Sequence, residues 1–433
     1  MNLKLSALMA LFLPIFAFAE DKLDSGDTAW MMISTALVLL MTPAGLALFY
    51  GGMTRSKNVL NTYAMVMGAF VMAFVVWIIA GYSIAFGTSA DPMLQNVFGG
   101  FNHIMLDGIK WTDLSGTYPT YVFIAFQGTF AAITVAIASG SVIGRMKFST
   151  WMVIVVLWGL LVYAPITHMV WGGGVLMTHG ALDFAGGTVV HMNGGLAGLV
   201  LAILVGKRMD YNKVPMKPYS ILFTAVGASL LWFGWYGFNG GSAFGANAIA
   251  GLAVMTTTVA TAVAGITWML LEWIVFKKPT LLGIASGIIA GLVAITPAAG
   301  FVSVGGAFIL GIVGAIVAFF GVIKLKKVFG YDDSLDAFGI HFLAGLWGAL
   351  ATAFLALDDK DLLWDGPLKE SGDRMGQFMV QVESVLIVGA WTLVGTIVVY
   401  YIASALTGGA RVDEETEHNG LDETIHGETV TNS

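Results

Sequence analysis

The chain has 433 residues, of which 57% are hydrophobic and only 11% are charged, and its formal net charge is −7. Soluble domains carry about 25% charged residues, so this composition excludes an ordinary soluble domain and predicts a polytopic membrane protein. The negative charge argues against nucleic acid as a partner. Because the sequence has no cysteine, disulfides and thiolate metal sites are excluded as well.

The first residues of the chain have the pattern of a secretory signal peptide. Lys4 precedes a short apolar run, and Ala17-Phe18-Ala19 stands before Glu20 in the manner of a cleavage site. The apolar run is shorter than the ~20 residues that a membrane span needs. We therefore predict a signal peptide at 1–19 and a mature chain that begins near Glu20. A retained first helix is the alternative.

The mature chain contains eleven apolar segments long enough to cross ~30 Å of hydrocarbon. They lie at about 28–52, 60–86, 118–143, 149–171, 187–206, 219–238, 246–276, 280–297, 304–323, 337–356 and 377–406. Pro43, Pro165 and Pro297 need not end helices that pack among other helices. The sequence thus predicts an all-α polytopic membrane protein with eleven transmembrane helices.

Basic residues gather in alternate loops between these segments. On one side stand Arg55, Lys57, Arg145, Lys147, Lys207, Arg208, Lys213, Lys217, Lys277, Lys278, Lys324, Lys326, Lys327 and Arg411. The other side of the mature chain has only five basic residues: Lys22, Lys110, Lys360, Lys369 and Arg374. Because cytoplasmic loops are enriched in lysine and arginine, we expect the mature N-terminus outside and the C-terminus in the cytoplasm. An odd number of spans agrees with this orientation.

One frame of residues occurs twice in the chain. Asp183 is followed by His191 and then by Gly194-Gly195-Leu196-Ala197-Gly198, and Asp333 is followed in the same way by His341 and Ala344-Gly345-Leu346-Trp347-Gly348. The two copies stand five spans apart, so they run in opposite directions, as in the inverted repeats of transporters and channels. Chance recurrence in a glycine-rich chain is the alternative.

This repeat sets the expected domain organisation. Residues 20–406 would form the membrane domain, with repeats at about 28–206 and 219–356 and an added helix at 377–406. Residues 407–433 would form a cytoplasmic tail. If each aspartate marks the start of its helix, each histidine lies ~12 Å into the membrane from its own side. Across ~30 Å of hydrocarbon, the two rings would then meet near the midplane.

Two neutral imidazoles at that depth have limited chemistry. Each has one donor and one acceptor nitrogen, and burial favours the neutral form. The pair therefore suits a small neutral hydrogen-bonding molecule or a relayed proton, and does not suit a bare metal cation. Two separate histidines, each bonded to a backbone carbonyl, are the alternative. The other histidines are expected to be solvated: His103, His168, His179, His418 and His426.

The stretch Asp183-Phe184-Ala185-Gly186-Gly187-Thr188-Val189-Val190-His191 resembles the signature of the Amt/Mep/Rh ammonium transporter family, in particular its bacterial AmtB type. The resemblance extends from the signal peptide to the tail. It implies a homotrimer in a bacterial inner membrane, with one pore per subunit and no cofactor. It also implies that His191 and His341 are the twin histidines of the pore.

The resemblance assigns further roles to single residues. It implies an outer ammonium site made of Trp171, Phe130, Phe238 and Ser242. It implies that Phe126 is the second phenylalanine of a gate, that Asp183 supports the outer site, and that Thr296 lines the pore. Aromatic faces and a hydroxyl are suited to ammonium, because a cation–π contact contributes ~0.5–2 kcal/mol and a hydroxyl accepts an N–H.

The sequence departs from the family after the second histidine. Phe342-Leu343 stands where the family usually has glycine, so this face of the helix is expected to pack differently. The acidic tail has few apolar residues and by itself is typical of a solvated or disordered segment. Gly420-Leu421-Asp422 and His426-Gly427-Glu428 resemble the tail that docks the family's PII signal protein.

These patterns lead to one expected function and two alternatives. We expect an ammonium transporter, not an enzyme, that recruits ammonium outside, deprotonates it and passes ammonia along the histidines. One alternative is an ammonium sensor of the same fold that signals through a partner. The other is an intramembrane metalloenzyme, although Asp183 and Asp333 lie far from the histidines along their helices and zinc sites need three or four protein ligands.

Overall fold

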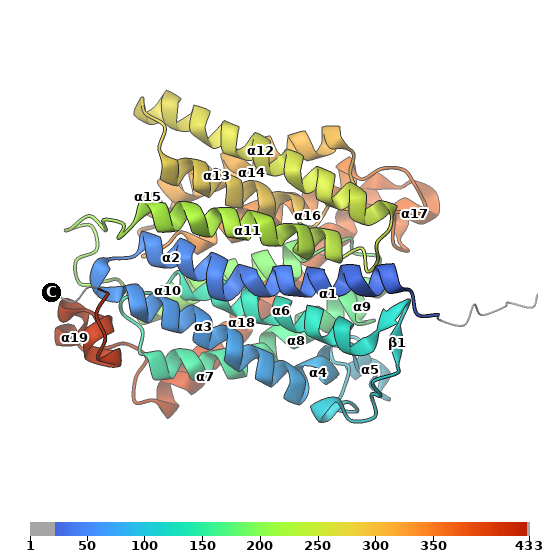
Figure 1. Cartoon of the computed structure of the whole chain (residues 1–433), viewed down its shortest axis with the longest axis horizontal. Coiled ribbons are helices and arrows are strands. Elements are labelled where there is room, and N and C mark those ends of the chain that lie inside the picture. Colours follow the sequence, from blue (N-terminus) through green and yellow to red (C-terminus); the bar gives the residue numbers. More distant parts are fainter. Residues whose placement is uncertain (1–21, 431–433) are drawn as a thin grey trace, which may run out of the picture.

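A computed structural model describes residues 22–430 of the chain. The signal peptide expected at 1–19 lies outside the described residues. The long helices lie with their axes roughly parallel and form one bundle (Figure 1). The first helix begins at one end of the bundle, and the C-terminus lies at the other. The strands β1 (Leu114–Ser115) and β2 (Tyr118–Pro119) form a small antiparallel pair at the end where the first helix begins. The expectation of a helical fold is confirmed.

The first half of the chain contributes five membrane-length segments. They are α1 and α2 (Ser25–Leu40 and Ala47–Met53), α3 and α4 (Val59–Val76 and Tyr82–Phe86), α6 (Thr120–Ser139), α7 to α9 (Phe148–Trp158, Ala164–Trp171 and Val175–Thr178), and α10 (Asn193–Val205) with the turn before it. Between the second and third of them lies the short helix α5 (Pro92–Gln95).

The second half contributes five more, together with one shorter apolar helix. They are α11 (Ile221–Gly241), α12 (Ala248–Phe276), α14 and α15 (Val304–Phe320 and Lys326–Phe329), α16 (Leu343–Leu355) with the turn before it, and α18 (Arg374–Leu406). The shorter helix is α13 (Leu281–Ile295). Ten helices within residues 22–430 are thus long enough to span, and the eleventh span remains a prediction that rests on α13.

Six of the spanning segments contain a π-helical turn, which takes one residue more than an α-helical turn. These turns are Met41–Leu46, Trp77–Gly81, Gly159–Tyr163, Gly187–Met192, Gly321–Leu325 and Phe338–Phe342. Pro43 lies inside the first turn, and Pro165 follows the third at the start of α8. The wider turn accommodates a residue without an N–H, so both helices continue past their prolines.

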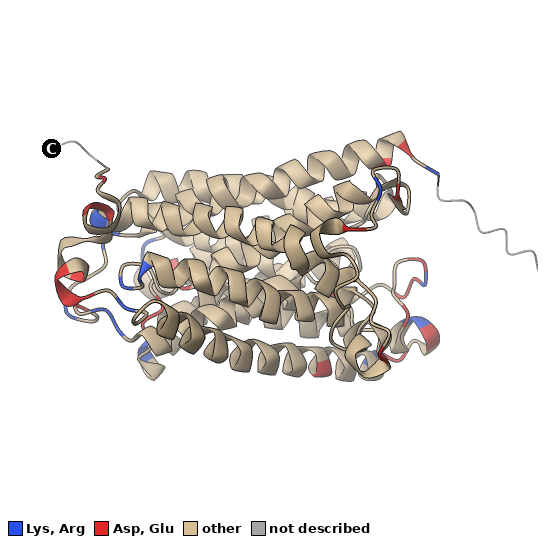
Figure 2. Cartoon of the chain, turned by 90° about the horizontal axis from the view of Figure 1, so that it is seen from below, with Lys and Arg blue, Asp and Glu red and all other residues tan. Residues whose placement is uncertain are grey.

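Charged residues avoid the middle of the bundle. Lys and Arg are concentrated at the end where the C-terminus lies (Figure 2). The two short connecting helices α17 (Pro367–Ser371) and α5 lie at the opposite end. The bundle therefore has two chemically different ends and an apolar belt between them, as a membrane protein requires.

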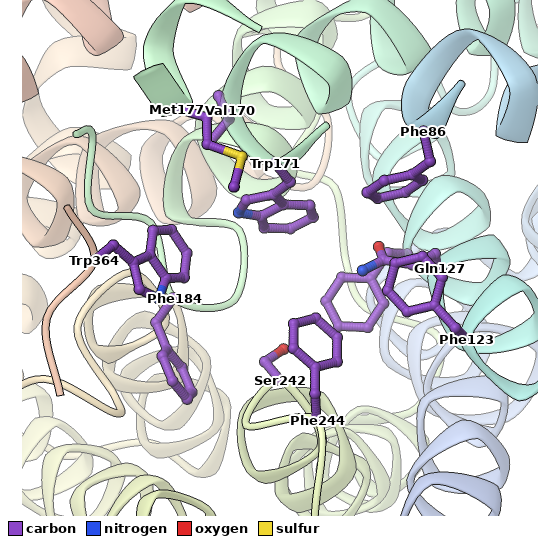
Figure 3. A pocket seen from close by; sticks show the side chains of 11 residues that line it. Phe86, Phe123, Gln127, Val170, Trp171, Met177, Phe184, Ser242, Phe244 and Trp364 are labelled. Atoms are coloured by element: carbon purple, nitrogen blue, oxygen red, sulfur yellow. The ribbon is translucent and has the colours of Figure 1, made fainter. Parts of the chain in front are cut away.

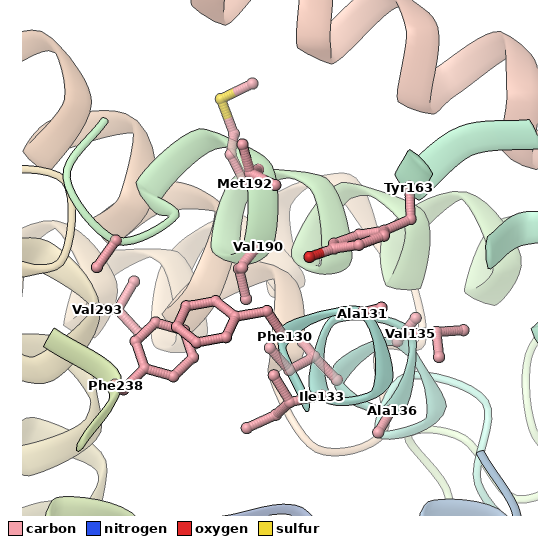
Figure 4. Close-up of a cluster of buried hydrophobic side chains, with 14 of the residues drawn as sticks. Phe130, Ala131, Ile133, Val135, Ala136, Tyr163, Val190, Met192, Phe238 and Val293 are labelled. Carbon is pink, nitrogen blue, oxygen red and sulfur yellow. The ribbon is translucent and has the colours of Figure 1, made fainter. Parts of the chain in front are cut away.

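The centre of the bundle is closely packed around α6. Phe130 of this helix lies beside Val190 and stacks on Phe238 of α11 (Figure 4). Every one of these side chains is less than 7% exposed. The turn that carries His191 therefore lies in a buried apolar setting.

Candidate functional site

The two histidines of the repeated frame meet inside the bundle. Nδ1 of His341 lies 3.3 Å from Nδ1 of His191, and the rings are nearly parallel, with centroids 5.4 Å apart and planes inclined by 20°. The side chains are 5% and 1% exposed. The meeting of the two rings that the sequence predicts is present in the structure.

The path by which the chain reaches this point differs from the expectation. The histidine-bearing helices begin with π turns at Gly187 and Phe338, and the aspartates lie on irregular backbone before them. The assumption of a continuous helix from Asp183 to His191 was therefore wrong. Only the last few residues before each histidine are helical. The backbone between each aspartate and the start of its π turn is mostly buried and non-helical. Such backbone is tolerated in a membrane where it is enclosed by protein.

The two aspartates hold these turns to different extents. Asp183 accepts hydrogen bonds from the backbone N–H groups of Gly186, Gly187, Thr188 and Val189 at 2.6–3.2 Å and from the Thr188 hydroxyl. Within residues 22–430, the carboxylate of Asp333 accepts only the N–H of Phe338, at 2.8 Å, and its Oδ1 is unpaired. One aspartate is saturated by its own helix start, and the other is not.

Glycines of the repeated frame allow the two turns to approach each other. A Cβ added to Gly195 would lie 2.5 Å from the backbone nitrogen of Phe342. A Cβ added to Gly345, the equivalent residue of the second copy, would lie 2.9 Å from the carbonyl oxygen of Gly187. Each copy thus supplies the gap into which the other copy's backbone fits. The Phe342 ring stacks on Phe338 at 4.9 Å, which is how this chain packs the face where glycine was expected.

A tryptophan that the sequence did not single out completes the surroundings of the pair. The ring of Trp235, from α11, stacks on His191 with centroids 5.2 Å apart. Its Nε1 donates to Oγ1 of Thr296 at 2.9 Å, and Thr296 itself donates to the carbonyl of Leu292 at 2.7 Å. Thr296 is thus bonded to the indole that stacks on His191.

Two stacked phenylalanines lie between the histidines and the end of the bundle that carries α5 and α17. Phe130 and Phe238 have centroids 4.1 Å apart, and Phe238 lies 5.8 Å from the His191 ring. Phe126 packs against Phe130 at 4.8 Å but is fully buried beside the pair. Phe130 thus contacts both rings and stacks more closely on Phe238. The gate role expected for Phe126 stays a prediction.

An aromatic cavity of 240 Å³ lies beyond this pair (Figure 3). Three of the expected outer-site residues line it: Phe130, Trp171 and Ser242. Phe238 is not in its lining and forms the closed pair below. Asp183 is also absent from the lining, because its carboxylate faces the backbone of its own helix start and its carbonyl accepts the Trp171 indole N–H at 2.8 Å.

Hydrogen bonds fix the polar groups of this cavity. The Ser242 hydroxyl donates to the carbonyl of Phe238 at 2.8 Å, so the oxygen lone pairs remain available to accept a bond from a bound molecule. The other residues that line the cavity were not predicted from the sequence: Phe86, Phe123, Gln127, Val170, Met177, Phe184, Phe244 and Trp364. A signal for some of them existed, because Phe123, Gln127 and Phe130 follow one face of α6 at helical spacing.

The described part of the tail is ordered and packs on the end that carries the basic loops. Of the two states expected from its composition, solvated or disordered, its exposed acidic residues fit the first. The carboxylate of Asp422 accepts the N–H groups of Leu60 and Asn61 at 3.0 and 2.8 Å, which caps the start of α3. Glu417, on α19 (Glu414–Asn419), pairs with Arg411 at 2.7 Å and accepts the N–H of Met209 at 2.8 Å.

Two histidines that were expected to be solvated have structural contacts. His426 lies against Phe148 and within 3.0 Å of the Asn61 amide. His168 is fully buried, and its ring nitrogens lie 2.9 Å from the carbonyl of Ala85 and 2.7 Å from that of Gln95. His179 is half-exposed and pairs with Glu383, closer to the expectation.

A buried ionic network joins the loops near the tail. Asp332 is 1% exposed and receives bonds from the Arg208 guanidinium at 2.6–3.2 Å. Burial would raise the pKa of Asp332, but the bonds and charges of Arg208 and Arg145 lower it below its usual value. Arg145 is fully buried, and burial lowers the pKa of its guanidinium to about 10, so it remains charged at neutral pH.

Comparison with known proteins decides the family. The sequence pattern of the Ammonium Transporter Family matches residues 29–431. The chain belongs to this family. It is 46% identical over 422 residues to an ammonium transporter from Aquifex aeolicus, covering 96% of each chain.

Solved structures support the same family. The fold matches Mep2 from Saccharomyces cerevisiae with a TM-score of 0.83 and 32% identity over 91% of this chain and 89% of that one. It also matches a structure titled "Sensor Amt Protein", with a TM-score of 0.84 and 26% identity over 93% and 98% of the chains. The family consists of membrane transporters, so the expectation that the chain is not an enzyme is confirmed and the metalloenzyme alternative is set aside.

Proposed function

We propose that the transporter recruits ammonium in the aromatic cavity, removes a proton and passes ammonia along His191 and His341, with or without the proton following. One observation carries the proposal. Nε2 of His191 is fully buried and has no hydrogen-bond partner within residues 22–430. Buried polar atoms are rarely left unpaired, so an open nitrogen in an apolar passage marks a place for a hydrogen-bonding guest.

Recruitment is supported by the chemistry of the outer cavity. The faces of Phe130 and Trp171 attract a cation through their π electrons, and Ser242 offers a lone pair for an N–H. The lining of the cavity contains no charged side chain, so a bound cation is not held by an ion pair and can leave again. These features suit a small cation that carries N–H donors.

Deprotonation is supported by the closed pair below the cavity. Phe130 and Phe238 stack closely, so an intact ammonium ion would lose its hydration shell between two apolar rings at large cost. Ammonia loses far less on entering the same passage. Potassium has no proton to give up, so this route would reject potassium by chemistry as well as by size.

The decisive experiment uses purified protein in proteoliposomes and measures ammonium flux, ammonium-driven current and potassium exclusion together. His191→Ala and His341→Ala each remove one ring of the pair. We expect a sharp loss of ammonium-driven current, or a leak of intact cations. If both variants keep wild-type current and still exclude potassium, the pair is structural and the proposed route is wrong.

A sensor role is the second candidate, and the match to the sensor structure favours it. A sensor would bind ammonium in the same cavity without passing it. The proteoliposome experiment separates the two, because a sensor gives binding without flux even when the wild-type protein is reconstituted at high density.

We also propose the setting in which the transporter acts. The concentration of Lys and Arg at the C-terminal end supports a cytoplasmic tail and an outer mature N-terminus in a bacterial inner membrane. The family supports a homotrimer, and crosslinking of the purified protein tests it. The exposed acidic face of the tail, with Glu414, Glu415 and Glu423, supports docking of a PII signal protein, which a pull-down with and without residues 412–433 tests.

A further inference from the structure

The outer cavity contains a second hydrogen-bond acceptor that the proposed recruitment site does not use. Gln127 lies on α6 one turn before Phe130, is 3% exposed, and lines the cavity together with Trp171 and Ser242. Figure 3 shows its amide directed between the rings of Phe86 and Phe123 and the open space of the cavity. Its Oε1 has no hydrogen-bond partner within residues 22–430.

An unpaired amide oxygen at such a position is costly to keep. Buried polar groups are almost always hydrogen-bonded, and an exception calls for a partner that comes and goes. The other polar groups of the cavity wall differ in this respect, because the Trp171 N–H and the Ser242 O–H both donate to backbone carbonyls. Since no protein partner fixes the oxygen, the terminal amide can turn it toward a guest.

We infer that Gln127 is a direct ligand of the recruited ammonium ion. Its amide oxygen accepts one N–H, the Ser242 oxygen accepts a second, and the faces of Trp171 and Phe130 contact the remaining charge. The inference rests on the proposed recruiting function of this cavity. It adds a directed contact, because an amide oxygen accepts an N–H of the guest, whereas the aromatic faces attract only its charge.

The test replaces Gln127 in two ways and measures ammonium-driven current in proteoliposomes over a range of ammonium chloride concentrations. Gln127→Met keeps an unbranched side chain of similar length but removes the acceptor. Gln127→Glu keeps the acceptor and adds a charge. We expect Met to raise the half-saturating concentration about tenfold or more, as loss of a hydrogen bond to a charged group does. Glu should leave it at or below the wild-type value.

Two results would overturn the inference. One is an unchanged half-saturating concentration in Gln127→Met. The other is an equal rise in the Met and Glu variants, which would show that the residue acts through packing alone.

Trp171→Leu, measured alongside, keeps this inference distinct from the recruiting site itself. If Trp171→Leu weakens half-saturation while Gln127→Met does not, only the role of Gln127 fails. If neither substitution has an effect, the cavity does not recruit ammonium, and the proposed outer site fails with it.

Discussion

Trp235 and Thr296, which lie 61 residues apart in the sequence, are joined by a buried 2.9 Å hydrogen bond from the indole nitrogen to the hydroxyl oxygen. The same indole stacks on His191. The orientation of the ring beside the histidine pair therefore depends on a threonine of another helix.

Thr296→Val tests this dependence, because valine has the shape of threonine but no oxygen. The Trp235 N–H then loses its partner inside the bundle, at a cost of about 1–3 kcal/mol in unfolding free energy. Maximal ammonium flux should fall as the ring loses its fixed position. Thr296→Ser, which keeps the hydroxyl, is the control and should retain most of the flux. Equal behaviour of the two variants in thermal unfolding and flux would contradict the positioning role.

The outer cavity gives a second prediction. Trp171→Leu removes a cation–π face, and Ser242→Ala removes an acceptor, so each should weaken ammonium recruitment by about 1 kcal/mol or more. In proteoliposomes the half-saturating ammonium concentration should rise several-fold, with a smaller change in maximal current. Leu39→Ala, at an exposed position of α1, serves as a control for general effects of substitution. Wild-type half-saturation in both cavity variants would count against a recruiting site.

The unequal bonding of the repeat-related aspartates gives a third prediction. Asp183→Asn places an amide NH₂ group against backbone N–H donors that now face carboxylate oxygens. Two donors then oppose each other in a buried site, so we expect a loss of several kcal/mol and little folded protein. Asp333→Asn can keep its one acceptor bond and direct the NH₂ group to the unpaired side. Yield and thermal unfolding should therefore fall much more for Asp183→Asn, and equal losses would refute this reading.

The ionic network near the tail gives a prediction for pH. The pKa of Asp332 is lowered in the folded protein, so the carboxylate contributes stability that is complete above its unfolded pKa of about 4. That contribution is lost as the pH falls through the folded value. Asp332→Asn should cost about 3–5 kcal/mol at neutral pH, because Arg208 is left without its partner. The difference in melting temperature between the wild type and the variant should shrink below about pH 4; a constant difference would be inconsistent with this prediction.

The tail gives a fifth prediction. Asp422→Ala removes the acceptor for two N–H groups at the start of α3, which should cost about 1 kcal/mol and loosen the tail. Limited proteolysis should then cleave the segment after Val412 faster than in the wild type. Glu414→Ala, at an exposed residue of α19, is the matched control and should not change the cleavage rate. Unchanged cleavage of the Asp422 variant would show that other contacts hold the tail.

The sequence carried the framework of the site. Hydropathy located the spans, because a helix in lipid must be apolar over its whole length. The repeated frame predicted that His191 and His341 meet, because spacing and opposed helix direction are both properties of the sequence. The glycines are part of the same repeated frame. They are needed there because the backbone of one copy packs directly against the glycines of the other.

Other features of the structure could not be predicted from the sequence pattern. Trp235 is one of 13 tryptophans, and nothing in its neighbours distinguishes a ring that stacks on a histidine from one that faces lipid. Each π turn adds one residue to a helix, and the pattern of apolar residues in the sequence does not reveal it. The docking of the acidic tail was missed because its partners, such as the N–H groups of Leu60 and Asn61, are backbone atoms of a distant segment.

The cap that Asp422 places on α3 can form only late in synthesis. The capped residues leave the ribosome early, and the carboxylate that caps them is made 361 residues later than Asn61. During translation, the start of α3 must depend on water for its free N–H groups. A chain that stops before Asp422 never acquires the cap, even if all of its spans have been inserted. A nascent or truncated copy therefore lacks both this cap and the contacts that His426 makes with Asn61 and Phe148.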